Sequence, residues 1–240
     1  MNRIDGTQEN ELRPVTMTAN FVDFAEGSVL IQCGKTKVLC CASVEDGAPR
    51  HVPEGTGWVT AEYSMLPRAN RERSRRDVSK LKLSPRSAEI QRLIGRSLRA
   101  AVDLAALGER TITVDCDVLQ GDGGTRTASV TGGFAALAIA CRKLVETGAL
   151  EKSPIKGQVA AVSAGIVEDV PLLDLCYEED SRAMVDLNCV MNERGELIEL
   201  QGTGEGRGFT VAEQRALVDL CAGGIRELMK KQKEILGGRF

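Results

Sequence analysis

The chain has 240 residues, of which 42% are hydrophobic and 27% are charged, and its formal net charge is −3. This is the composition of an ordinary globular protein, and it excludes a disordered chain, a collagen and a coiled coil. No apolar run approaches the roughly 20 residues of a membrane helix, and the polar start MNRIDGTQENELRP lacks the apolar core of a secretion signal. We therefore expect a cytoplasmic protein with no membrane partner.

The cysteines and the histidine narrow the possible chemistry. Most of the eight cysteines lie in apolar runs and none forms a Cys-x-x-Cys pair, which predicts reduced thiols in the core. His51 is the single histidine, so a zinc site built from several histidines is excluded. It stands in the loop-like stretch GAPRHVPEGTG, where we expect an ordinary surface histidine rather than a member of a catalytic triad.

The first third of the chain predicts β-structure. Residues 28–44 contain two β-rich runs on either side of a Gly34-Lys35 turn, which is the pattern of a hairpin. Residues 56–66 are typical of a further strand.

A strongly basic segment follows. Residues 68–99 contain eleven basic residues against three acidic ones, and arginine outnumbers lysine by nine to two. The planar guanidinium group offers paired donors that match phosphate oxygens, so this bias favours a phosphate-rich ligand. A solvated face or an oligomer contact is the alternative.

The basic segment divides into a loop and a helix. Residues 69–80 show no apolar periodicity, which predicts a mobile loop, whereas residues 84–107 predict a helix with one apolar face. Members of that face are Ile90, Leu93, Ile94, Leu98, Ala101 and Val102. Arg92, Arg96 and Arg99 share another face of this helix.

Regular elements continue to the end of the chain. Residues 111–119 alternate apolar and polar residues as a half-buried strand does, and a glycine-rich turn and a helix with a small-residue face follow. Residues 157–167 predict a buried strand, and residues 182–206 predict a hairpin that turns at 192–195. Thr210 and Glu213 form a capping box that begins a long final helix.

These elements predict an α+β fold: a two-layer, sheet-on-helix arrangement in which mixed β-sheets with β-hairpins pack against helices. No linker of low complexity interrupts the chain, so we expect a single domain over residues 1–240.

Two helix starts are candidate anion sites. The turn Gly121–Thr127 follows a strand and opens a helix, where free backbone N–H groups and the helix dipole attract an anion. Ser84-Pro85 begins the basic helix, and Arg86 in its first turn opposes the helix dipole, so a bound anion would relieve that cost. A tight turn and a solvated arginine are the ordinary alternatives.

Two aspartates are candidate metal ligands. Asp186 stands among apolar residues of a predicted strand, which is unusual unless that face lines a site. Asp180 ends the acidic run that begins at Tyr177. Hard carboxylate oxygens without a nearby histidine suit Mg²⁺ or Mn²⁺.

Several of these stretches together resemble the ribonuclease PH family of bacterial phosphorolytic 3′ exoribonucleases. They are the opening NELRP, the SPR helix start, the GTR turn after a strand, and YEED with VD one strand later. The resemblance covers essentially the whole chain, and it implies a ribonuclease PH-like fold.

The resemblance also implies roles for individual residues. Inorganic phosphate, held by Arg86 and by the turn of Gly124, Thr125 and Arg126, would attack the last phosphodiester of an RNA and release a nucleoside 5′-diphosphate, reversibly. Asp180 and Asp186 would support the metal and the chemistry. The residues leave open whether an aspartate holds the metal or protonates the leaving 3′ oxygen.

The partners implied are precursor tRNA with an unpaired 3′ end and five further copies of the chain, in a hexameric ring built as a trimer of dimers. The candidate RNA contacts are Arg68, Arg73, Arg76, Arg92, Arg96 and Arg99. For the first three, a contact between subunits is an equal alternative.

Two other functions use some of the same residues. An inactive RNA-binding ring subunit would not need both arginine sites and both aspartates. A hydrolytic metal-dependent nuclease would leave the two phosphate-shaped arginine sites without a role.

Overall fold

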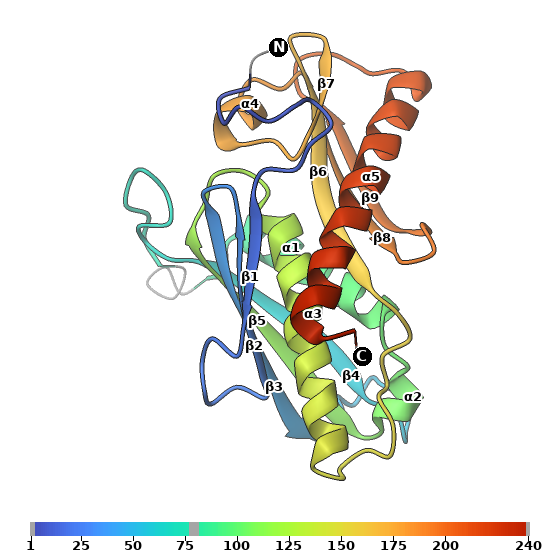
Figure 1. Cartoon of the computed structure of the whole chain (residues 1–240). Coiled ribbons are helices and arrows are strands. Elements are labelled where there is room, and N and C mark those ends of the chain that lie inside the picture. Colours follow the sequence, from blue (N-terminus) through green and yellow to red (C-terminus); the bar gives the residue numbers. More distant parts are fainter. Residues whose placement is uncertain (1–2, 77–81, 239–240) are drawn as a thin grey trace.

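The computed structural model describes residues 3–76 and 82–238, which form two β-sheets and the helices packed against them (Figure 1). In chain order the elements are β1 (Val15–Ala19), β2 (Gly27–Cys33), β3 (Thr36–Asp46), β4 (Trp58–Met65), α1 (Pro85–Ala100), α2 (Leu104–Leu107), β5 (Arg110–Gln120), α3 (Thr125–Glu146), β6 (Val159–Val167), β7 (Val170–Leu173), α4 (Tyr177–Asp180), β8 (Val185–Asn192), β9 (Leu197–Gly204) and α5 (Val211–Leu236).

The two sheets follow one another in the sequence. The first has the strand order β1-β2-β3-β5-β4 and the second β7-β6-β8-β9. Strands β4 and β5 run parallel, so the first sheet is mixed, whereas the second is antiparallel throughout. The predicted α+β class is confirmed.

Both predicted hairpins are present. Strands β2 and β3 pair antiparallel around Gly34, whose φ of +55° is a left-handed value that glycine adopts without strain. Strands β8 and β9 turn at residues 192–195, where the N–H of Gly195 donates to the carbonyl of Asn192 over 3.0 Å. Strand β1 extends the first hairpin, and the sequence analysis did not predict it.

The single helix predicted over residues 84–107 is wrong near its end, where a break at residues 101–103 divides it into two helices. Ser84 caps α1 as expected, because its side chain accepts a hydrogen bond from the N–H of Ser87. However, α1 ends at Ala100, and Asp103 starts α2 by accepting from the N–H groups of Ala105 and Ala106. A side-chain cap of this kind competes with continuation of the helix.

Helix α3 is the central core helix of the protein. It packs against β2 and β3 of the first sheet and against β6 of the second, and most of its residues are buried. Its length and hydropathy would also suit a membrane span, but 83% of the apolar window is buried inside the protein, as in the core helix of a globular protein. The small residues predicted on its face, Ala128, Gly132, Ala135 and Ala136, are all buried.

The final helix covers the second sheet. Helix α5 begins with the predicted capping box of Thr210 and Glu213 and packs on β6, β7 and β8. Leu217, Cys221 and Leu228 on the inner side of this helix are buried, whereas Leu220 is only half-buried. All eight cysteines are free thiols and seven are buried, which confirms the prediction of reduced core cysteines.

Adjacent glycines of α3 give a test of this packing. A Cβ atom on Gly132 would lie 2.7 Å from Cγ2 of Ile31, whereas one on Gly133 would meet its nearest neighbour at 3.4 Å, an ordinary contact. We expect Gly132→Ala to lower the free energy of unfolding by about 1–3 kcal/mol through overpacking. Gly133→Ala should raise it by up to about 1 kcal/mol through helix propensity. Urea unfolding of both variants measures this, and equal effects would contradict the close approach of α3 to β2.

Candidate active site

A polar cavity of about 630 Å³ is open between the two sheets. The first sheet and its helices contribute the end of β5, the start of α3 and the start of α1, and the second contributes β6, β8 and α4. The residues around it are Met65, Asn70, Arg86, Gly121, Gly123, Gly124, Thr125, Arg126, Ser163, Tyr177, Asp180, Ser181, Ala183, Asp186, Asn188 and Glu205. The cavity therefore brings together the predicted phosphate-binding residues and both predicted aspartates.

The glycine-rich turn opens α3 in a form suited to an anion. Gly123 and Gly124 have φ values of +78° and +65°, a region that L side chains rarely adopt. Gly124 is the N-cap of the helix and provides no side-chain cap, so the first N–H groups of a 22-residue helix lack the usual side-chain acceptor. Free N–H groups together with the helix dipole attract a phosphate oxygen.

Thr36 and Thr127 fix the shape of this turn. The hydroxyl of the buried Thr36 donates to the carbonyl of Gly123 over 2.6 Å and accepts from the N–H of Asp122 over 2.8 Å. The hydroxyl of Thr127 donates to the carbonyl of Gly124 over 3.0 Å. The N–H groups of the turn are thus held in place before any ligand arrives.

Two arginines face the same cavity from different helices. Arg126 lies in the first turn of α3, where it donates to Oε1 of Gln201 over 3.1 Å and lies 3.6 Å from a carboxylate oxygen of Glu89. Arg86 lies in the first turn of α1, and its side chain is exposed to the cavity. Their two positive charges flank the helix start and add to its attraction for an anion.

The surroundings of Asp180 and Asp186 disfavour the charged form of both carboxyl groups. Burial, together with the negative charge of Asp180, raises the pKa of Asp186 to about 6, although Arg126 acts in the opposite direction. Burial also raises the pKa of Asp180, and Arg86 and Arg126 oppose that shift. Carboxylates held near each other in a cavity gain from a cation that neutralises them.

The donors around the cavity fit a magnesium ion better than zinc. Within residues 3–76 and 82–238 no group of three histidine, cysteine, aspartate or glutamate side chains is arranged as a complete metal site. Mg²⁺ is commonly bound by one or two carboxylates, with phosphate oxygens of the substrate and water as its other ligands. Asp180 and Asp186, beside the anion-binding turn, would supply those carboxylates.

The structure also places two residues at the site that the sequence analysis missed. Asn188, two residues after Asp186 on β8, donates to Oδ2 of that aspartate over 3.1 Å. Ser163 of β6 is 4% exposed, lines the cavity, and has no partner for its hydroxyl among the described residues. Ser163 and Asn188 are surrounded in the sequence by buried strand residues. They lie on the same face as Asp186 because side chains alternate between the two faces of a strand.

A buried ion pair joins the two halves of the site. Arg13 donates to Oδ1 of Asp174 over 2.7 Å, and both side chains are almost fully buried. The same guanidinium donates to the carbonyl of Asp122, and the backbone N–H of Arg13 donates to Oδ2 of Asp174 over 3.0 Å. Burial alone would lower the pKa of Arg13, but the adjacent carboxylate raises it above its usual value.

A second buried pair positions α4. Arg3 makes a two-bond contact with Glu179, with both nitrogen–oxygen distances at 2.9 Å, and also donates to the carbonyl of Asp174 over 3.0 Å. Glu179 in turn accepts from the N–H of Cys176 over 3.0 Å. Because Asp180 follows Glu179 directly, this network fixes where that aspartate stands.

The predicted RNA-binding arginines are found in two settings. Arg68, Arg73 and Arg76 are exposed in the loop after β4, whose predicted span of 69–80 extends into residues 77–80, outside the described part of the chain. The N–H of Gly121 donates to the carbonyl of Ala69 over 2.9 Å, which ties the base of this loop to the candidate anion-binding turn, residues 121–127. The RNA contact of these arginines stays a prediction.

The three arginines of α1 have contacts of differing kind. Arg96 makes a two-bond contact with Glu199. Arg99 donates to the carbonyl of Val59 over 2.8 Å and lies 4.2 Å above the ring of Trp58. Arg92 is exposed. A binding role for all three also stays a prediction.

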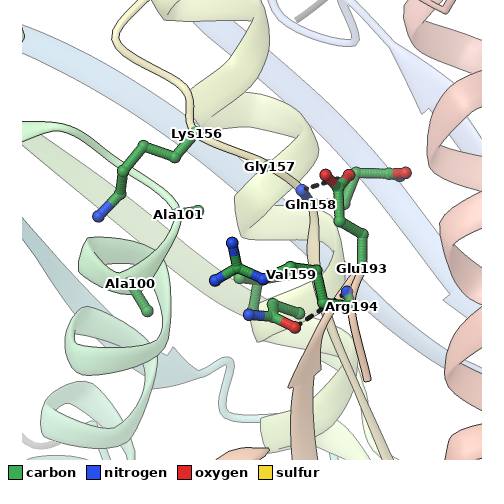
Figure 2. A pocket seen from close by; sticks show the side chains of 9 residues that line it. Ala100, Ala101, Lys156, Gly157, Gln158, Val159, Glu193 and Arg194 are labelled. Atoms are coloured by element: carbon green, nitrogen blue, oxygen red, sulfur yellow. Dashed lines mark hydrogen bonds between the residues drawn. The ribbon is translucent and has the colours of Figure 1, made fainter. Parts of the chain in front are cut away.

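A smaller pocket of about 130 Å³ lies at the far end of β8, beside Asn192. Figure 2 shows its charged side chains. Lys156 and Arg194 are basic, but Arg194 is paired with Glu196 over 2.8 Å, and Glu193 accepts from the N–H of Gln158 over 3.3 Å. No convergent set of phosphate-binding groups appears among its lining residues. The larger cavity is therefore the candidate site.

Known proteins are similar to this chain in sequence and in fold. The family models for the 3′ exoribonuclease family match residues 11–143 (domain 1) and 157–220 (domain 2). The ribonuclease PH proteins of Dehalococcoides mccartyi strains BAV1 and CBDB1 are each 56% identical to the chain over 236 residues, which cover 98% of this chain and 98% of theirs.

Solved structures agree on the fold. Rice (Oryza sativa) Rrp46 has a TM-score of 0.79 at 19% identity, with 98% of this chain and 100% of that chain covered. An Archaeoglobus fulgidus exosome with RNA bound to the active site contains a chain with a TM-score of 0.77 at 25% identity, with 96% of this chain and 92% of that chain covered.

The Arg13–Asp174 pair gives a stability prediction. Arg13→Met leaves a buried carboxylate without its partner, so we expect the free energy of unfolding to fall by about 3–5 kcal/mol. The double variant Arg13→Met/Asp174→Asn should recover part of that loss, because it removes the orphaned charge. Arg71→Met, which breaks the exposed pair with Glu178, is the matched control and should change little. Urea unfolding measures all three, and equal effects of Arg13→Met and Arg71→Met would contradict the prediction.

The raised pKa of Asp186 gives a second prediction. Its pKa is about 6 in the folded protein and 3.8 ordinarily, so between these values the folded state binds more protons and stability falls as pH rises. Without divalent cations, Asp186→Asn should therefore melt several degrees higher than the wild type at pH 7.5, with a smaller difference at pH 5. Mg²⁺ should narrow the gap at pH 7.5 by stabilising the charged wild type. Identical melting temperatures at pH 7.5 would contradict the raised pKa.

Proposed function

This chain belongs to the 3′ exoribonuclease family, and on that premise we propose that it is a phosphate-dependent enzyme that shortens RNA from its 3′ end. The observation that carries the proposal is the uncapped start of α3, flanked by Arg86 and Arg126, in the same cavity as two aspartates. A water-using nuclease would need the carboxylates but not this anion site.

The reaction follows from the charges of the cavity. Inorganic phosphate, held by the N–H groups of Thr125 and Arg126 and by the two arginine side chains, is already an anion and needs no histidine to activate it. A phosphate oxygen forms a bond to the phosphorus of the last phosphodiester, and the bond from that phosphorus to the 3′ oxygen breaks. The products are a nucleoside 5′-diphosphate and an RNA one nucleotide shorter. The exchange is reversible, because it replaces a phosphodiester by a phosphoanhydride.

Asp180 and Asp186 would hold Mg²⁺, or Mn²⁺, at this site. The ion would neutralise the charge that develops on the phosphoryl oxygens. The chain itself positions the reactants: the N–H groups and the arginines orient the incoming phosphate, and Asn188 orients Asp186 through its hydrogen bond.

For the substrate and assembly we propose precursor tRNA with an unpaired 3′ end and a homohexameric ring built as a trimer of dimers, in the cytoplasm. Relatives of known structure support an RNA substrate and an assembly, since one is an exosome with RNA at its active site. The exposed Arg68, Arg73 and Arg76, on a loop tied to the anion-binding turn, would contact the body of the tRNA.

We also propose that both sheets fold as one domain over residues 1–240. Support comes from the main apolar core, which contains Val159 and Ala161 of β6 and Val190 of β8 as well as the first sheet. Helix α3 packs against both sheets.

The decisive experiment follows the product released from a 3′-labelled RNA in Mg²⁺, with and without inorganic phosphate. We expect labelled nucleoside diphosphate only with phosphate, and faster release from a tRNA precursor than from its isolated tail. Labelled monophosphate formed without phosphate would contradict the proposal and indicate a hydrolase. RNA binding with no release in either condition would indicate an inactive ring subunit.

Arg126→Ala tests the anion site in the same assay. Removing a charged donor to phosphate costs about 1.5–3 kcal/mol, so we expect the KM for phosphate to rise about 10- to 150-fold while RNA affinity stays near that of the wild type. Arg226→Ala, an exposed arginine of α5 that does not line the cavity, is the control. An unchanged KM for phosphate in Arg126→Ala would remove this arginine from the site.

A further inference from the structure

Tyr177 is an aromatic residue that lies at the surface and not in the hydrophobic core. It is the first residue of α4, is 54% exposed, and lines the same cavity as Arg126 and Asp180. Of the described residues around this cavity, it is the one with an aromatic ring. The whole chain has only eight aromatic residues, and 3% is a low share. The ring thus offers one flat aromatic face among the mostly polar residues that line this cavity.

Tyr177 stands directly beside the anion-binding turn. A Cβ atom placed on Gly123 would lie 3.0 Å from the backbone nitrogen of Tyr177 and would clash with the carbonyl of Leu175. Gly123 is thus the residue that lets the start of α4 pack against the turn. The ring of Tyr177 therefore lines the cavity next to the candidate anion site.

The position of the ring is fixed by the chain around it. Helix α4 is held through Glu179, which is bound by Arg3 and by the N–H of Cys176. On the outer side, Arg71 of the basic loop donates to Oε1 of Glu178 over 2.6 Å. A cation from the basic loop therefore stands at the same rim as the ring. An aromatic face beside basic groups is the combination with which proteins hold single-stranded nucleic acids.

We propose that Tyr177 is a stacking platform for a nucleobase of the last two nucleotides of the RNA substrate. The proposal rests on the proposed function, since it takes the phosphodiester at the RNA 3′ end to lie beside the anion-binding turn. Stacking accepts every base because each has a flat π-face, so this contact suits an enzyme that removes nucleotides in succession whatever their identity. Because α4 is held in advance, little order has to be gained on binding.

The test is RNA binding without phosphate or Mg²⁺, so that no turnover occurs. A 5′-fluorescein-labelled unpaired oligonucleotide is titrated with wild type, Tyr177→Ala and Tyr177→Phe, and binding is followed by anisotropy. Stacking is worth about 1–3 kcal/mol for each base, so we expect Tyr177→Ala to raise the Kd about 5- to 150-fold. Tyr177→Phe keeps the ring and should stay near the wild type.

The same titration with an RNA whose last two nucleotides are abasic identifies the contact. We expect the wild type to bind this RNA as weakly as Tyr177→Ala binds the ordinary one, and the substitution to have no further effect on it. In phosphorolysis assays, Tyr177→Ala should keep the KM for phosphate of the wild type. That result separates a lost stacking contact from a distorted anion site.

Three results would overturn the proposal. These are an unchanged Kd for ordinary RNA, an equal loss of affinity for ordinary and abasic RNA, and a raised KM for phosphate in Tyr177→Ala. Failure of the proposed function is a separate result, because it would appear as a wild type that releases no nucleoside diphosphate with phosphate present.

Discussion

The buried pair of Arg13 and Asp174 is the interaction on which the site depends. Removing two charges from water costs several kcal/mol for each, and the attraction within the pair together with its further hydrogen bonds must offset that cost. Here the extra bonds reach Asp122 in the anion-binding turn and the backbone of Arg13 itself. One ion pair thereby links the turn of the candidate anion site to the end of β7 in the second sheet, which carries Asp186 on β8. The fold and the candidate site share this contact.

Helix α3 serves two purposes that place opposite demands on its sequence. Along most of its length it is a core helix, where small residues let two sheets approach it closely. Its first turn lines a polar cavity, and the N-cap residue, the left-handed Gly124, provides no side-chain cap for the first N–H groups. A rigid, buried helix is a good base for such a site, because its dipole direction cannot adjust to the ligand and the donors are ordered in advance.

Local sequence patterns predicted those elements of the fold that depend on interactions between residues close together in the sequence. The alternation of residues 111–119, the Gly34 turn and the Thr210–Glu213 box each act within a few residues, and all three were confirmed. The break after Ala100 was missed because apolar spacing continues across it. Arg13 and Ser163 were missed for another reason: the partner of Arg13 lies 161 residues away, and Ser163 differs from its core neighbours only by the face of β6 on which it stands.

Arg3 and Arg13 cannot form their ion pairs until the later part of the chain has been synthesised. Arg3 and Arg13 are synthesised before their carboxylate partners, Glu179 and Asp174, which follow 176 and 161 residues later. Until then the N-terminal segment cannot dock, and neither α4 nor the anion-binding turn has its final support. A nascent chain that already displays the basic residues 68–76 therefore has no assembled site until residues 174–186 have also been made.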